Sequence, residues 1–270
     1  MRLLFVGDVM GRSGRDAVTK HLPKLKRDLK IDVAVVNADN ASHGLGVTES
    51  NCKELYAAGA DCITTGNHVW DQREIIPYIA RDPKLIRAIN FPKGTPGNST
   101  FIFTTGEGQK ILITHALCRL FMDDLDCPFT GTDEILKEYK IGKNVDAIFI
   151  DLHGEATSEK NAYAHYFDGR VSAVVGTHTH MPTADCQTYP NGTGYQSDAG
   201  MTGDYDSVIG VRKDISIHRF VKKTPTERMV PADSEATFCG TFIEINAKGL
   251  CSRIEPVIVG PRLKNTIPAV

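Results

Sequence analysis

Side chains that can bind metal ions follow five predicted β-strands, each at the point where the strand ends. They are Asp8, Asp39-Asn40, Asn67-His68, His153 and His178-Thr179-His180. In open α/β sheets, ligands bind in the crevice beyond the carboxyl ends of the strands. Oxygen and nitrogen donors delivered to one such edge by five strands therefore predict a metal site.

Each piece taken alone has an ordinary structural explanation. Asp8 could cap a helix, Asn67-His68 could form a surface turn, and His153 could be a buried side chain with a hydrogen-bond partner. His178 and His180 are more specific, because alternate residues of an extended segment point to the same side. It is the complete set, in this order, that favours a metal site.

The elements that must position these side chains alternate between strands and helices. Short apolar runs predict strands at 3–6, 33–36, 62–65, 85–89, 101–104, 111–114, 147–150 and 173–175. Amphipathic patterns predict helices at 14–29, 49–58, 71–80, 133–139 and 158–166, and Pro23 is expected to kink the first. Later runs at 184–188, 194–196, 215–220, 241–245 and 253–259 have strand character. We expect one mixed α/β domain over residues 1–270, parallel at first and antiparallel later.

Composition excludes several classes of protein. The 270 residues are 41% hydrophobic and 24% charged, which is ordinary for a globular chain. Lys and Arg total 31 against 33 Asp and Glu, a net charge of −2, so no global positive charge favours nucleic acid or an anionic membrane. The seven cysteines form no CxxC pair. With no signal peptide or apolar span predicted, we expect a cytoplasmic protein without membrane contact.

The ordered motifs resemble a known pattern. Asp…Asp-Asn…Gly-Asn-His…His…Gly-Thr-His-Thr-His is similar to the calcineurin-like metallophosphoesterases, in which such blocks carry a dinuclear metal site. The match is closer to one branch, the YmdB-type 2′,3′-cyclic nucleotide 2′-phosphodiesterases. The similar stretches are Gly7–Gly11, Asp151–Thr157, Asp168–His180 and Gly200–Gly210. The resemblance runs from Met1 to about Asn246 and implies a metallophosphoesterase-type α/β sandwich, with two mixed β-sheets flanked by helices.

One motif departs from this branch. The second block reads Asn37-Ala38-Asp39-Asn40, where the branch has Gly-Glu-Asn. Asp39 is one methylene shorter than Glu, but aspartate bridges metals in the wider superfamily. We therefore expect the site to be retained, with a change in metal spacing or preference.

The resemblance also implies roles for the site residues. By family position, one ion is held by Asp8, Asp39, Asn40 and His180, and the other by Asp39, Asn67, His153 and His178. Mixed nitrogen and oxygen ligands without thiolate favour two divalent ions, Fe or Mn. A metal-bridging hydroxide would attack phosphorus and open the 2′ bond to give the 3′-nucleotide. His68 follows a ligand directly and is expected to be the general acid.

Other readings stay open. Arg12, His43 and Arg119 are weaker candidates for contacts with a small phosphodiester substrate. The same dimetal core could serve a phosphomonoesterase or a nuclease, although no basic stripe with interleaved aromatics favours stable nucleic-acid binding. A regulatory scaffold that binds metal or nucleotide with little turnover is favoured only by Asp39. A homo-oligomer is implied by resemblance.

Overall fold

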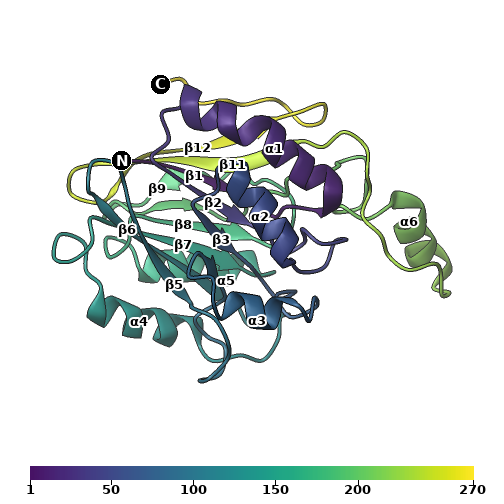
Figure 1. The fold of residues 1–270 in the computed structure, drawn as a ribbon, viewed down its shortest axis with the longest axis horizontal. Helices are drawn as coiled ribbons and strands as arrows, with labels where there is room; N and C mark the ends of the chain where they lie inside the picture. The colour runs from purple at the N-terminus through teal and green to yellow at the C-terminus, as the bar shows by residue number, and fades with distance from the viewer.

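The computed structural model describes residues 1–270 as two six-stranded sheets that lie face to face, with helices on the outer faces (Figure 1). The first sheet has the order β12-β11-β1-β2-β3-β4 and the second β5-β6-β7-β8-β10-β9. The strands of the first sheet are β1 (Arg2–Val6), β2 (Val33–Asn37), β3 (Cys62–Thr64), β4 (Leu85–Ile86), β11 (Phe238–Ile245) and β12 (Cys251–Val259). Those of the second are β5 (Thr100–Thr104), β6 (Lys110–Leu117), β7 (Ala147–His153), β8 (Ala173–Thr177), β9 (Gln187–Thr188) and β10 (Gly194–Gln196).

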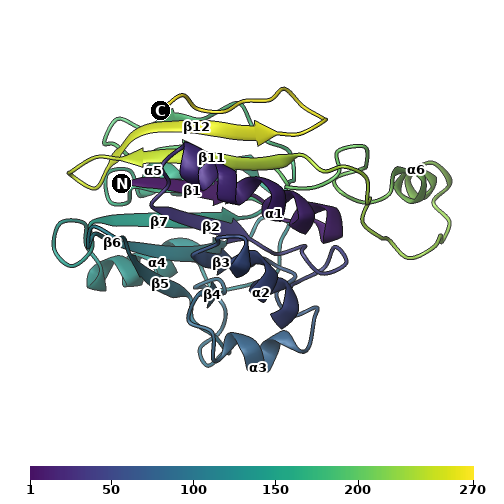
Figure 2. The ribbon, with the colours of Figure 1, turned by 45° about the horizontal axis from the view of Figure 1, so that its top comes forward.

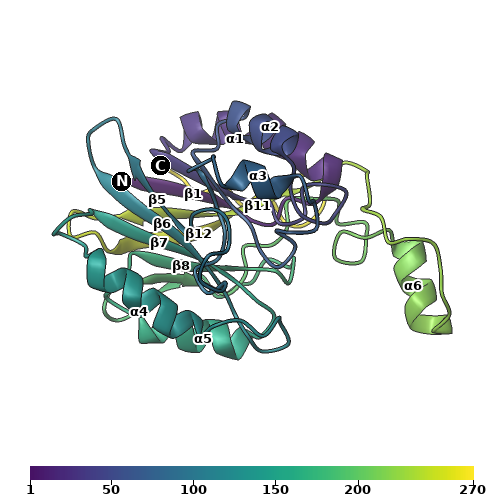
Figure 3. The same ribbon diagram turned by 60° about the horizontal axis from the view of Figure 1, so that its bottom comes forward.

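Five of the six helices form two outer layers (Figure 3). The six helices are α1 (Gly11–Asp28), α2 (Glu49–Ala57), α3 (Ile75–Ile79), α4 (Pro128–Glu138), α5 (Thr157–Tyr166) and α6 (Lys213–Lys222). The first three lie on the side of the first sheet, and α4 and α5 lie on the side of the second (Figure 3). Helix α6 belongs to neither layer and stands away from the sheets. None of the helices combines the length and apolar character needed to traverse a bilayer.

Alternation along the central strands creates this layering. On β1, Leu4 and Val6 pack in the apolar cluster beneath α1, whereas Leu3 and Phe5 pack in the cluster between the sheets. Phe149 of β7 enters the same intersheet cluster, and its ring centroid lies 5.1 Å from that of Phe5. Because side chains alternate between the two faces of a strand, each central strand is buried on both sides. The two sheets are thus fixed against each other.

Parallel pairing sets the place of the site. β1, β2 and β3 run parallel in the first sheet, and β6, β7 and β8 run parallel in the second. The expectation of parallel strands first and antiparallel strands later is therefore wrong for β6, β7, β8 and β10, which pair in parallel. The α/β class with two mixed sheets flanked by helices is confirmed.

Two element predictions are corrected by the structure. Residues 215–220 were expected to form a strand but lie in α6, because the apolar residues Ile217, Phe220 and Val221 have helical spacing rather than strict alternation. The helix expected at 71–80 covers only Ile75–Ile79, since residues 67–74 form turns beside the site. Pro23 lies inside the uninterrupted α1.

Candidate metal centre

Two buried carboxylates face the site without full hydrogen bonding. Asp8 follows β1 and Asp39 follows β2, and both are essentially inaccessible to solvent. Asp8 Oδ1 and Asp39 Oδ2 make no hydrogen bond. These oxygens lie 3.7 Å and 3.5 Å, respectively, from the two ring nitrogens of His153. An unpaired buried carboxylate oxygen is costly, and a cation is the partner that would offset this cost.

His153, at the end of β7, is held in a defined orientation. Thr177 Oγ1 donates to Asp151 Oδ1 at 2.7 Å. The hydroxyl has one hydrogen, so it accepts from His153 Nδ1 at 2.9 Å. The Nε2 atom therefore keeps its lone pair toward Asn67 Oδ1, 2.9 Å away. This arrangement, a ring nitrogen fixed by a hydrogen bond on its other side, is the one that metal-binding histidines use.

The segment after β8 presents two histidines in left-handed backbone conformations. The φ angles are 100° at His178 and 67° at His180. The premise of an extended His-x-His segment is therefore wrong, and the two imidazoles have separate partners. His178 Nδ1 lies 3.2 Å from His153 Nε2, and His180 Nε2 lies 3.2 Å from Asn40 Oδ1. The strained turn distributes its imidazoles between two groups of donors.

Buried polar groups hold this turn in place. Asp198 Oδ2 accepts from the Thr179 backbone nitrogen at 3.0 Å and from its hydroxyl at 2.8 Å. The buried Lys160 donates to the same oxygen at 3.1 Å and to the carbonyl oxygen of Thr177 at 2.8 Å. His180 Nδ1 donates to the Ile209 carbonyl oxygen at 2.7 Å, which leaves its Nε2 for the site. Sequence reasoning did not single out Thr177, Lys160, Asp198 or Ile209.

The turn after β3 brings Asn67 and His68 over Asp39. A Cβ atom on Gly66 would stand 2.5 Å from Asp39 Cγ and 2.6 Å from His153 Cε1, so only glycine fits there. The backbone nitrogen of His68 donates to Asp39 Oδ1 at 3.0 Å. Its ring nitrogen Nδ1 donates to Asp71 Oδ2 at 2.8 Å. His68 thus lies beside the donors while its Nε2 remains available to a substrate.

Burial controls the charge of the site. Desolvation raises the pKa of Asp39 to about 7 and raises that of Asp8 well above its ordinary value. Desolvation also lowers the pKa of His178 to about 4 and lowers the pKa values of His153 and His180. The imidazoles are therefore neutral at pH 7, which is the form that binds metal.

A cavity of about 390 Å³ opens on these donors. Asp39, Asn40, His68, His178 and His180 line it, together with Glu155, which lies 3.2 Å from His178 Nε2. Glu155 belongs to the Asp151–Thr157 stretch that the sequence marked without assigning it a role. Apart from Gly44 and Thr179, the remaining wall is apolar and contains Met10, Leu45, Ile209, Val211 and Met229.

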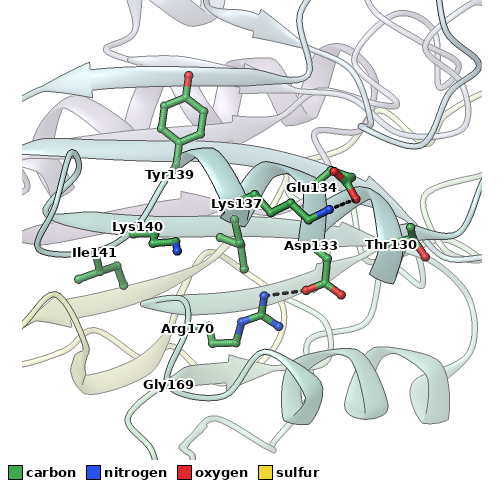
Figure 4. A pocket seen from close by; sticks show the side chains of 10 residues that line it. Thr130, Asp133, Glu134, Lys137, Tyr139, Lys140, Ile141, Gly169 and Arg170 are labelled. Carbon is green, nitrogen blue, oxygen red and sulfur yellow. Dashed lines mark hydrogen bonds and ion pairs between the residues drawn. The ribbon is translucent and has the colours of Figure 1, made fainter.

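The three weaker candidates do not line this cavity. Arg12 pairs with Asp233 at the surface, and Arg119 lines a separate hollow beside Glu159. His43 is exposed in a turn. A larger cavity of about 620 Å³ lies beside α4, where Asp133 pairs with Arg170 and Glu134 with Lys137 (Figure 4). Most of the charged side chains in this cavity pair with one another, so it offers no set of unpaired metal donors comparable to that of the metal centre.

The residues present fit a metal centre of mixed donors. The amide oxygens of Asn40 and Asn67 lie within the same set of contacts as the imidazoles and carboxylates. The contacts unite His180 with Asn40, and His153 with Asn67, His178 and Asp39. The two carboxylate oxygens without hydrogen bonds complete a donor set of oxygen and neutral nitrogen.

Comparison with known proteins identifies the family. A family model described as YmdB-like protein matches residues 4–257. The chain belongs to the YmdB-like family. It is 45% identical over 246 residues to a 2′,3′-cyclic-nucleotide 2′-phosphodiesterase of Bacillus subtilis, and the match covers 91% of this chain and 92% of the relative.

Two solved structures confirm the fold of this YmdB-like protein. A protein from Thermus thermophilus has a TM-score of 0.90 and 39% identity, covering 97% of this chain and 100% of its own. A phosphatase from Mycoplasma pneumoniae has a TM-score of 0.88 and 31% identity, covering 96% and 93%. The metallophosphoesterase-type sandwich is thereby confirmed, and the Bacillus subtilis and Mycoplasma pneumoniae relatives are phosphoester-hydrolysing enzymes by name.

Asp39→Asn is predicted to stabilise the metal-free protein at about pH 8. A carboxyl whose folded pKa is raised favours folding only at low pH, and this contribution is lost between about pH 4 and pH 7. The free energy of unfolding should rise by up to about 4 kcal/mol, at about 1.4 kcal/mol per pKa unit. Urea unfolding after chelation measures it, with the exposed Asp16→Asn as the control. An unchanged or lower free energy of unfolding at pH 8 would contradict the conclusion that ionised Asp39 destabilises the metal-free fold.

Thr177→Val is predicted to weaken metal binding about 10–100-fold, because it removes the hydroxyl that orients His153. Thr177→Ser keeps the hydroxyl and should bind metal nearly as the wild type does. Competition with a chromogenic chelator measures both affinities. Equal losses in the two variants would show that packing, rather than the hydrogen bond, is responsible.

Proposed function

We propose that this YmdB-like protein hydrolyses 2′,3′-cyclic nucleotides to 3′-nucleotides with the help of two divalent ions. The observation that carries the proposal is the pair of buried carboxylate oxygens, on Asp8 and Asp39, that lack hydrogen bonds beside neutral imidazoles. The Bacillus subtilis relative, named a 2′,3′-cyclic-nucleotide 2′-phosphodiesterase, supports this choice of substrate.

The donor contacts support the division of ligands between two ions. One ion would be held by Asp8, Asp39, Asn40 and His180, and the other by Asp39, Asn67, His153 and His178. When bound, such ions supply an activated water and the positive charge that a phosphodiester needs. The chain's own task is to keep the imidazoles neutral and oriented, which Thr177 does for His153 and the Ile209 carbonyl does for His180.

We assign to His68 the protonation of the leaving group. Asp71 accepts from its Nδ1 at 2.8 Å, so a protonated ring carries its second hydrogen on Nε2. The side chain lines the cavity and follows the ligand Asn67. In this proposal the Nε2 hydrogen passes to the ribose O2′ as its bond to phosphorus breaks. Asp71 stabilises the charged ring before the transfer.

The charge of the cavity favours a small diester. Its lining contains no Lys or Arg, so the ions must supply the positive charge at the phosphate. A diester carries one negative charge, whereas a phosphomonoester carries about 1.5 to 2 at pH 7. A polynucleotide would need further cations along its backbone. Both features favour a cyclic phosphodiester over the monoesterase and nuclease alternatives.

The apolar wall suits the nucleoside part of the substrate. Ile209 has a φ of 46°, which is unusual for a β-branched residue, and its side chain is 53% exposed. The turn is held by the hydrogen bond from His180 to the Ile209 carbonyl. We assign to Ile209 and Met229 the surface on which the nucleobase packs while the phosphate lies at the metal donors.

Several finer parts of the proposal come from the family resemblance. These are iron or manganese as the ions, a cytoplasmic location, a homo-oligomeric state and the action of residues 1–270 as one metallophosphoesterase domain. Elemental analysis of the purified protein tests the first directly. About two Fe or Mn per chain is expected, with turnover of 2′,3′-cyclic AMP. A protein that stays inert after Fe(II) or Mn(II) is supplied would favour the scaffold reading.

His68→Ala is predicted to lower kcat for 2′,3′-cyclic AMP by about 10²–10⁴-fold while leaving metal content unchanged. Asp71→Asn should lower kcat less, because it removes only the carboxylate that accepts from His68 Nδ1. The exposed Arg73→Ala serves as the control on the same turn. Full activity of His68→Ala would remove this residue from the mechanism.

Ile209→Gly is predicted to raise KM for 2′,3′-cyclic AMP about tenfold, since part of a buried isoleucine contact is worth at least 1.4 kcal/mol. Glycine keeps the carbonyl and tolerates the positive φ. Met229→Ala should act in the same direction, and Ile267→Ala, exposed elsewhere, should have no effect. With ribose 2′,3′-cyclic phosphate, which has no base, KM should stay unchanged. An equal increase for both substrates would contradict a base-binding wall.

A further inference from the structure

Helix α6 projects from the molecule instead of covering a sheet. In all three ribbon views it stands apart from the sandwich, at the end of the segment that leaves and rejoins the body between residues 204 and 233 (Figures 1–3). Ile215 and Ser216 are the only buried residues of the helix. A helix with so few tertiary contacts gains little stability from its own chain, so a partner that covers it would stabilise it.

One face of α6 is an apolar stripe open to solvent. Ile217, Phe220 and Val221 are 53%, 70% and 68% exposed. Their spacing of three and four residues places them side by side on the helix. Single exposed apolar residues are common, but a contiguous stripe marks an interaction surface.

Free positive charge borders the stripe. Arg219, Lys222 and Lys223 form no ion pair with any carboxylate, whereas Arg212 and Lys213 at the start of the helix pair with Asp214 and Asp206. Lys223 Nζ lies 5.7 Å from the centre of the Phe220 ring. The complementary surface is therefore apolar and acidic.

The loop at residues 119–126, which follows β6, begins with the exposed Arg119 and is apolar and acidic from Leu120 onward. Leu120 and Phe121 are 50% and 88% exposed. Asp123 and Asp124 are exposed on this loop. Phe121 has a φ of 62°, a strained conformation for an aromatic residue, and Glu159 anchors the preceding turn by accepting from the backbone nitrogens of Arg119 and Leu120.

We propose that α6 of one copy of this protein binds the 119–126 loop of a second copy. The stripe packs on Leu120 and Phe121 while the free cations of α6 face Asp123 and Asp124. Two copies related by a two-fold axis can make this contact twice, once in each direction. A basic amphipathic helix can also lie on an anionic membrane. The acidic apolar loop on the same chain favours a second copy, since a membrane would leave that loop without a partner.

The experiment is a charge exchange followed by analytical ultracentrifugation across the micromolar range. The wild type is expected to self-associate, and added salt should weaken the association. Lys222→Glu/Lys223→Glu and Asp123→Lys/Asp124→Lys should each weaken it about tenfold or more. An equimolar mixture of the two variants should restore the wild-type mass, because each reversed helix then meets a reversed loop. Lys248→Glu/Lys264→Glu, at exposed sites elsewhere, controls for net charge.

Removal of the apolar part provides a second test. Phe220→Ala and Phe121→Ala should each weaken self-association, and circular dichroism should show an unchanged fold. A monomeric wild type would overturn the proposal, as would an oligomer that ignores the charge reversals or a mixture that fails to recover. Binding of the wild type to phosphatidylserine vesicles, lost in Phe220→Ala without any self-association, would assign α6 to a membrane instead. These measurements do not depend on the proposed hydrolysis.

Discussion

The burial of two carboxyl groups that each have an oxygen without a hydrogen bond is the constraint on which the rest of the structure depends. Asp8 and Asp39 come from the first sheet, and His153 and His178 come from the second. The intersheet cluster that contains Phe5 and Phe149 holds these two sets of donors within a few ångströms of each other. Apolar burial of this extent can offset a few costly polar groups. The fold thus tolerates a site that is unfavourable until cations occupy it.

Hydrogen bonds from residues outside the donor set hold the donors in position. Asp151 and Thr177 orient His153, while Lys160 and Asp198 fix the turn that carries His178. These groups are buried and hydrogen-bonded, so the rotamers of the donors are set before any ligand arrives. Preorganisation of this kind removes the reorganisation that a flexible site would need during the reaction. It also explains how two histidines can remain in left-handed conformations.

The sequence was sufficient to predict the strands and their terminal donors, because both follow from local pattern. Short continuous apolar runs identified β1 and β2, and the donors lie where those strands end. The conformations of the turns could not be predicted from the sequence, because they depend on hydrogen-bond partners that are distant in the chain. The segment after β8 was expected to be extended, yet hydrogen bonds to Asp198 impose a left-handed turn. The apolar residues of α6 were assigned to a strand although their spacing is helical, because a short apolar run in the sequence can belong to either element.

The segment at 204–233 links the metal centre to the surface proposed for association. At its base, the Ile209 carbonyl holds His180, and Met229 lines the cavity. At its tip lies α6. The other proposed surface is also close to a donor, because the backbone nitrogen of Cys118, just before the 119–126 loop, donates to the His153 carbonyl oxygen at 2.9 Å. Contact between copies would therefore order two segments that each hold one of the imidazoles. In such an assembly, the rigidity that the site requires comes partly from the neighbouring copy, which accounts for a helix that its own chain leaves uncovered.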